Sequence, residues 1–148
     1  MKHNFIKLKE TPGDGACLFN SVAFGLSYYR GDNTSNLSII RLGKKLRKNV
    51  VRTLKNEIEK NNSTFNNVIQ QIIIGEMSDY DNLSNSKKIS KYLRDMKKGT
   101  TWGGQLEVNV LNKLVQNEGF RGILIINEDT QKSMRYFAGS IKNKPNKD

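Results

Sequence analysis

The chain has 148 residues and a formal net charge of +11, from 25 lysines and arginines against 14 acidic residues. This length fits one domain with a real core. A single cysteine excludes an internal disulfide, no apolar run approaches the length of a membrane span, and residues 1–5 lack the apolar core of a signal peptide. We therefore expect an intracellular protein from a reducing compartment, with no cofactor and no metal site.

Apolar spacing predicts mainly helices in the first two-thirds of the chain. After a short edge segment at residues 5–8, a helix is expected to begin near Cys17 and to end at about residue 29. The loop at 31–35 supplies N-cap residues for a long amphipathic helix that ends near residue 59. The buried face of this long helix is predicted to contain Leu42, Leu46, Val50, Leu54 and Ile58.

Residues 61–63 break the pattern, and a second apolar stripe, interpreted as core, contains Phe65, Val68, Ile69, Ile72 and Ile73. Two more amphipathic helices follow. The continuous apolar run 122–126 is typical of a fully buried central strand, and 133–137 is expected to form a second strand. Helices first and strands last predict an α+β or papain-like α/β fold, in which helices pack on a small, mostly antiparallel sheet. The expected domain is 1–141, with a mobile tail at 142–148.

A glycine-rich turn precedes Cys17, the residue predicted to start the first helix. Gly13 and Gly15 let the backbone turn sharply and approach a substrate. The N–H groups at a helix start lower the pKa of a cysteine, and the thiolate is the nucleophilic form. Backbone N–H groups in such a turn can also form an oxyanion hole. A lone cysteine is often only a small buried residue, but the glycine turn favours a solvent-accessible nucleophile here.

The segment DGACLFNS at residues 14–21 resembles the nucleophile motif of the OTU (ovarian-tumour) cysteine proteases, most of which are deubiquitinases. A second segment, TWGGQLEV at 101–108, resembles the Trp-Gly-x-x-x-Glu signature of the same family. The two segments stand in the right order and at about the right distance, and the resemblance covers about residues 5–137. It implies a papain-like fold and thiol-dependent hydrolysis of the isopeptide bond between ubiquitin and lysine.

The resemblance gives roles to individual residues of the first motif. Cys17 would attack the carbonyl carbon and form a thioester, while backbone N–H groups near Gly15 and Ala16 would hold the oxyanion. Asp14 would fix the loop or orient a histidine. A simpler role for Asp14, as an N-cap or Asx-turn residue of the following helix, stays open.

In the second motif, Trp102 would cover the groove for the ubiquitin tail, and Gly103 and Gly104 would let that tail come close. The alternative is a core tryptophan followed by a helix-start turn. Glu107 is expected to cap or pair locally rather than to act in catalysis.

The family places its catalytic histidine on a late strand, whereas the single histidine of this chain, His3, precedes the cysteine. His3 is the only candidate base in the sequence, and a position near a terminus argues against it. Three explanations stay open. The favoured explanation is that this sequence ends before the histidine strand. The second is that the chain is an inactive relative that binds ubiquitin, and the third is that a base other than histidine acts.

The expected partner is ubiquitin or polyubiquitin, bound by a monomer. No nucleic-acid-binding motif is recognisable, so the positive charge is interpreted as a solvated basic face, and neither nucleic acid nor a membrane is an expected partner. A pathogen or viral protein that acts in a host cytoplasm is compatible with this reading.

Overall fold

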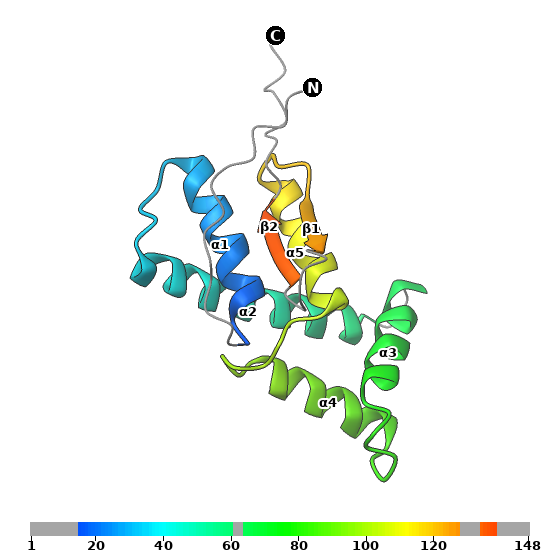
Figure 1. Cartoon of the computed structure of the whole chain (residues 1–148). Coiled ribbons are helices and arrows are strands. Elements are labelled where there is room, and N and C mark those ends of the chain that lie inside the picture. The colour runs from blue at the N-terminus through cyan, green and yellow to red at the C-terminus, as the bar shows by residue number, and fades with distance from the viewer. Residues whose placement is uncertain (1–14, 61–63, 128–133, 139–148) are drawn as a thin grey trace.

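The computed structural model describes residues 15–60, 64–127 and 134–138. In these ranges α2 contacts each of the other four helices, and α3 and α4 lie toward one end of it (Figure 1). The elements in chain order are α1 Cys17–Arg30, α2 Asn36–Glu59, α3 Thr64–Glu76, α4 Asn85–Met96, α5 Gln105–Asn117, β1 Ile123–Asn127 and β2 Met134–Ala138.

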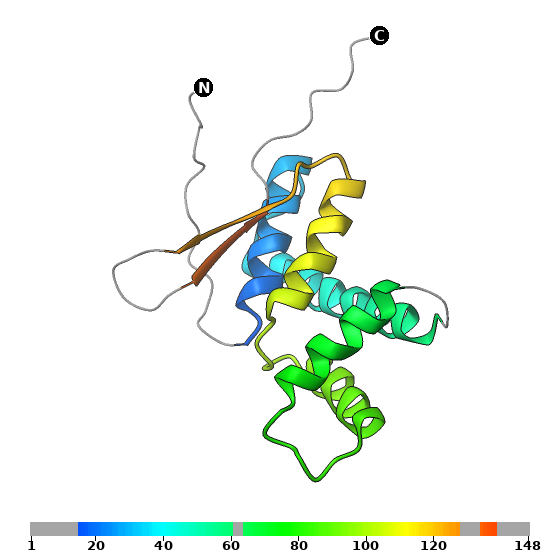
Figure 2. The ribbon, with the colours of Figure 1, turned by 90° about the vertical axis from the view of Figure 1, so that its right-hand side faces the viewer.

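The predicted fold class is wrong for the described part of the chain, which is predominantly helical. The helices pack mainly on one another instead of covering a sheet, because their apolar faces meet in one shared hydrophobic cluster. The only strands in the described ranges are β1 and β2, which form a short antiparallel ribbon that packs beside α1 (Figure 2). The prediction that a helix begins at Cys17 is confirmed.

The first two helices begin and end where local sequence signals predict. α1 ends at Gly31, whose φ of 72° is the left-handed conformation that glycine adopts without strain. The side chain of Ser35 caps α2 by accepting a hydrogen bond from the Ser38 N–H. On the predicted buried face of α2, Leu46, Val50 and Leu54 are buried, whereas Leu42 and Ile58 are half-buried.

The apolar stripe of α3 is only partly core, which corrects the prediction for that helix. Ile69 and Ile73 are buried, but Val68 and Ile72 are 49% and 39% exposed. The extensive contacts of α3 are with α2 and α4, so only one face of α3 is covered. The breadth of an apolar stripe therefore overstates how much of this helix is buried.

The two predicted strands exist, but β1 is not the central strand that its apolar run indicates. Among the described residues its one strand neighbour is β2, with Ile123 opposite Ala138 and Asn127 opposite Met134. The expected edge segment at 5–8, the break at 61–63 and the tail at 142–148 lie outside the described residues.

Candidate functional site

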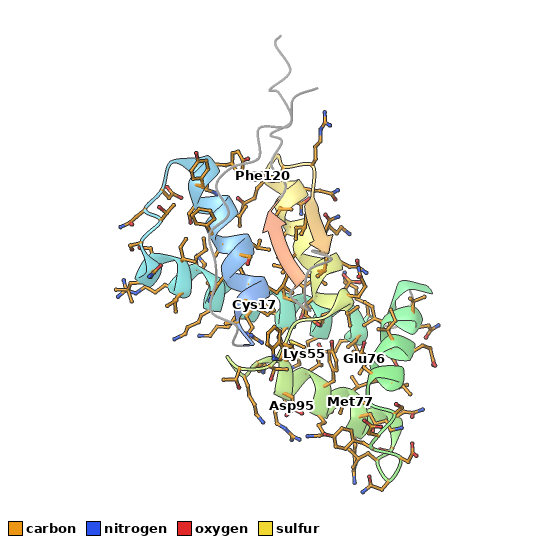
Figure 3. All side chains as sticks on the ribbon, in the orientation of Figure 1. Cys17, Lys55, Glu76, Met77, Asp95 and Phe120 are labelled. Atoms are coloured by element: carbon orange, nitrogen blue, oxygen red, sulfur yellow. The ribbon has the colours of Figure 1, made fainter. Side chains whose placement is uncertain are left out.

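Cys17 is the first residue of α1, and Ala16 is its N-cap. This position puts the thiol at the positive end of the helix macrodipole. The residue is 8% exposed and belongs to the hydrophobic cluster, so it is less accessible than the sequence predicts. Figure 3 shows it at the end of α1 that faces α4, away from Phe120 at the far end of α5.

The two motif segments pack directly against each other. A Cβ atom on Gly15 would collide with the Thr100 carbonyl oxygen, and one on Gly103 would lie 2.5 Å from Leu18 Cδ2. Gly15 therefore needs glycine, because backbone atoms of Thr100 and Thr101 fill the space that a side chain would take. At Gly103 the Leu18 side chain occupies that space, so a larger residue there would require Leu18 to move. This contact brings the turn before Cys17 beside the Trp102 segment, although some 85 residues separate them in sequence.

Arg47 of α2 joins these two segments through hydrogen bonds to backbone carbonyls. Its Nη2 donates to the Gly15 carbonyl oxygen at 2.8 Å, and its Nη1 donates to the carbonyl oxygens of Thr101 at 2.8 Å and Met96 at 3.0 Å. The guanidinium carbon also lies 4.3 Å from the centre of the Phe19 ring. Arg47 is only 4% exposed, so the relative position of the two motifs depends on a buried cation.

Arg47 was not among the predicted site residues, although the sequence contains a signal for it. It lies four residues after Gly43 and three before Val50, and these positions are both buried on the inner face of α2. An arginine within an otherwise apolar helix face needs hydrogen-bond acceptors when it is buried. The sequence can flag such a residue, but it cannot say which distant carbonyls accept.

Trp102 is 58% exposed, which rules out the core interpretation of this residue. Glu107, in contrast, is completely buried and has the local structural role that was predicted. Its Oε1 accepts a hydrogen bond from the Gly104 N–H at 2.8 Å, and its Oε2 accepts one from the Tyr92 hydroxyl at 2.7 Å. These bonds hold the start of α5 against α4, directly after the Trp102 segment.

Glu107, which is buried, and Tyr92, which is half-buried, both have shifted pKa values. Burial raises the pKa of Glu107, although the Gly104 N–H and the Tyr92 hydroxyl oppose that shift. Burial, with the charge of Glu107 beside it, also raises the pKa of Tyr92. Both shifts are toward the neutral form relative to the free side chains, because burial disfavours the charged form of each group.

A pocket of about 230 Å³ lies next to the second motif, between α3, α4 and the start of α5. The thiol is not among its lining residues, and Figure 3 shows Cys17 set apart from Glu76, Met77 and Asp95. Hydrogen bonds and charges from Lys91 and Lys98 lower the pKa of Asp95, since they favour its ionised form. The pocket lining comprises Glu76, Met77, Tyr92, Asp95, Met96, Thr101, Trp102, Gly104 and Glu107.

Two of the predicted site residues, His3 and Asp14, lie outside the described residues. Within the ranges that are described, no three His, Cys, Asp or Glu side chains are grouped so that they could hold a metal ion. None of the described helices is both long and apolar enough to cross a membrane.

The family model for the OTU-like cysteine proteases matches residues 12–144. Comparison with curated proteins and with solved structures gives no significant match. A glycine turn that leads into a helix-borne cysteine is the kind of site that a thiol protease uses. Because the family model covers nearly the whole chain, the protein belongs to the OTU-like cysteine protease family.

Proposed function

We propose that the protein is a deubiquitinase that cleaves the isopeptide bond between the ubiquitin C-terminus and a lysine side chain, with Cys17 as the nucleophile. The observation that carries the proposal is the contact between the two family motifs, which puts the Cys17 turn beside the Trp102 segment. Family membership supports the chemistry of the thiol.

In the proposed reaction the Cys17 thiolate adds to the isopeptide carbonyl carbon, and the backbone N–H groups near Gly15 and Ala16 hold the oxyanion. Collapse of this intermediate breaks the C–N bond, and the lysine amine leaves with a proton. Water then hydrolyses the thioester, which releases the ubiquitin carboxylate and restores the thiol. The proton transfers need a base, for which His3 is the histidine candidate in this sequence.

Ubiquitin with an electrophilic C-terminus should form a covalent adduct with the protein, and Cys17→Ala should abolish it. The cysteine is the only one in the chain, so the adduct has one possible thiol. Intact mass spectrometry measures the adduct, and cleavage of di-ubiquitin measures turnover. If the adduct forms slowly and turnover is weak, His3→Ala shows whether His3 contributes to either rate.

Ubiquitin without an electrophile is the control in this experiment. If unmodified ubiquitin binds equally well to the parent chain and to Cys17→Ala while no adduct forms, the protein is a ubiquitin-binding module and not an enzyme. Failure of both binding and labelling would contradict the proposed function altogether.

Trp102→Ala should weaken ubiquitin binding by about tenfold, because a large exposed aromatic side chain is the strongest candidate anchor beside the site. Leu37→Ala is the matched control, since Leu37 is 60% exposed on α2, outside both motifs. Isothermal titration calorimetry on both variants measures the difference. Equal affinities would place the ubiquitin groove away from Trp102.

A further inference from the structure

The outer face of α2 carries a continuous basic stripe that the proposed protease function does not use. Its six residues are all exposed, and they recur at intervals of three and four, which puts them on one side of the helix. No acidic residue of α2 precedes Glu57, so no carboxylate lies within this stretch. We call this surface the α2 stripe; it consists of Arg41, Lys44, Lys45, Lys48, Arg52 and Lys55.

No ion pair among the described residues neutralises the α2 stripe. Ion pairs in the described part of the chain involve other basic residues, namely Arg30, Lys60, Lys91 and Lys98. Like charges three and four residues apart destabilise a helix, and α2 has neither an acidic residue in its first turn nor a basic one in its last. Helix stability therefore does not explain the stripe, whereas an anionic partner would remove its self-repulsion.

We propose that the α2 stripe binds the phosphodiester backbone of a nucleic-acid duplex without reading its sequence. From Arg41 to Lys55 the helix rises by about 21 Å, and one strand of a duplex presents about six phosphates over that length. The stripe thus carries about as many cations as one strand carries phosphates over this axial length, and the phosphates on the side of the duplex that faces α2 are its expected contacts. None of the exposed residues of α2 is aromatic, which favours a duplex over an unstacked single strand that needs stacking platforms.

An anionic membrane fits the α2 stripe less well. A helix that lies in a membrane interface inserts its apolar face, but the main apolar face of α2 is buried against the other helices, with Val50 and Leu54 fully covered. The large apolar side chains that α2 exposes, Leu37 and Ile40, lie near its start, before the α2 stripe begins. From the sequence, the positive charge was interpreted as a solvated face, because composition does not show that six of the charges share one side of one helix.

The test is fluorescence anisotropy with labelled DNA and RNA duplexes of about 20 base pairs, titrated at several salt concentrations. The triple variant Lys44→Gln/Lys48→Gln/Arg52→Gln should bind at least about tenfold more weakly at low salt, and its slope of log affinity against log salt should be shallower by about 3. The matched control is Lys87→Gln/Arg94→Gln/Lys113→Gln, which removes the same number of exposed charges from α4 and α5. It should retain most of the affinity.

Circular dichroism and thermal melting check that both triple variants fold like the parent chain. Binding of either duplex with the expected difference between variants supports the proposal. Three results would overturn it: no duplex binding by the parent chain at low salt, equal weakening in both triple variants, or tighter binding to vesicles of phosphatidylcholine and phosphatidylserine than to either duplex. None of these results bears on ubiquitin cleavage, so the two proposals can fail separately.

Discussion

Replacing Arg47 with methionine is expected to lower the free energy of unfolding by about 3–5 kcal/mol. Methionine fills much of the same volume but donates no hydrogen bond, so the carbonyl oxygens of Gly15, Met96 and Thr101 lose their common donor. Burying unsatisfied carbonyls is costly because water cannot replace the lost partner. Urea unfolding followed by circular dichroism measures the change.

Arg52→Met is the control for that prediction, because Arg52 is an exposed residue of the same helix, and its loss should shift stability by no more than about 0.5 kcal/mol. Arg47→Lys keeps the charge but has a single donor nitrogen in place of the guanidinium group, so it cannot bond all of these carbonyls at once. This variant should fold, but the turn before Cys17 should be displaced. Its labelling by the electrophilic ubiquitin should be slower than that of the parent chain. Equal stability of Arg47→Met and Arg52→Met would show that the carbonyl network contributes nothing.

Replacing Glu107 with alanine is expected to lower the free energy of unfolding by about 3 kcal/mol. The change removes the acceptor of both the Gly104 N–H and the Tyr92 hydroxyl and leaves a cavity in a fully buried position. Glu107→Gln should cost far less, because its amide oxygen can accept from Gly104 and its amide nitrogen can donate to the Tyr92 oxygen. The same unfolding measurement separates the two variants.

The pH dependence of stability provides a second test of Glu107. Burial raises its pKa in the folded state, so the neutral carboxyl is favoured there. Its contribution to stability is therefore largest below the unfolded pKa of about 4.3 and declines as the pH rises through the raised folded value. Relative to Glu107→Gln, the parent chain should gain stability on acidification from neutral pH. A difference that is flat or opposite in sign would contradict the role of burial.

Local signals in the sequence predicted the helices well, since each depends on residues within a few turns. The start of α1 at Cys17, the cap at Ser35 and the end of α2 at Glu59 all follow from glycine, serine and apolar spacing. The prediction of a sheet covered by helices, with 122–126 as its central strand, was wrong because strand pairing depends on distant segments that periodicity does not specify. The exposure of Val68 was missed for the same reason, because it depends on which elements cover α3.

The residues of the two sequence motifs could be predicted as site residues, but the contacts between the motifs could not. Gly15 and Gly103 were identified as positions of close approach, but the expected neighbour was a substrate, and the structure puts protein atoms there. Exposure overturned one expectation and decided between two others: Cys17 is 8% exposed, although the glycine turn predicted an accessible thiol, and the 58% exposure of Trp102 excludes the core alternative for that residue. Arg47 acts across the fold, so no local pattern could assign its partners.

The bonds of Arg47 also determine when the site can form during folding. They connect residues that lie 32 to 54 positions apart in the chain, and such long-range contacts close large loops that are slow to form. The turn before Cys17 is synthesised early, yet it cannot be held in place until α2 and the segment after α4 have left the ribosome. A nascent chain that ends before residue 101 therefore carries the thiol without the arrangement that makes it a site.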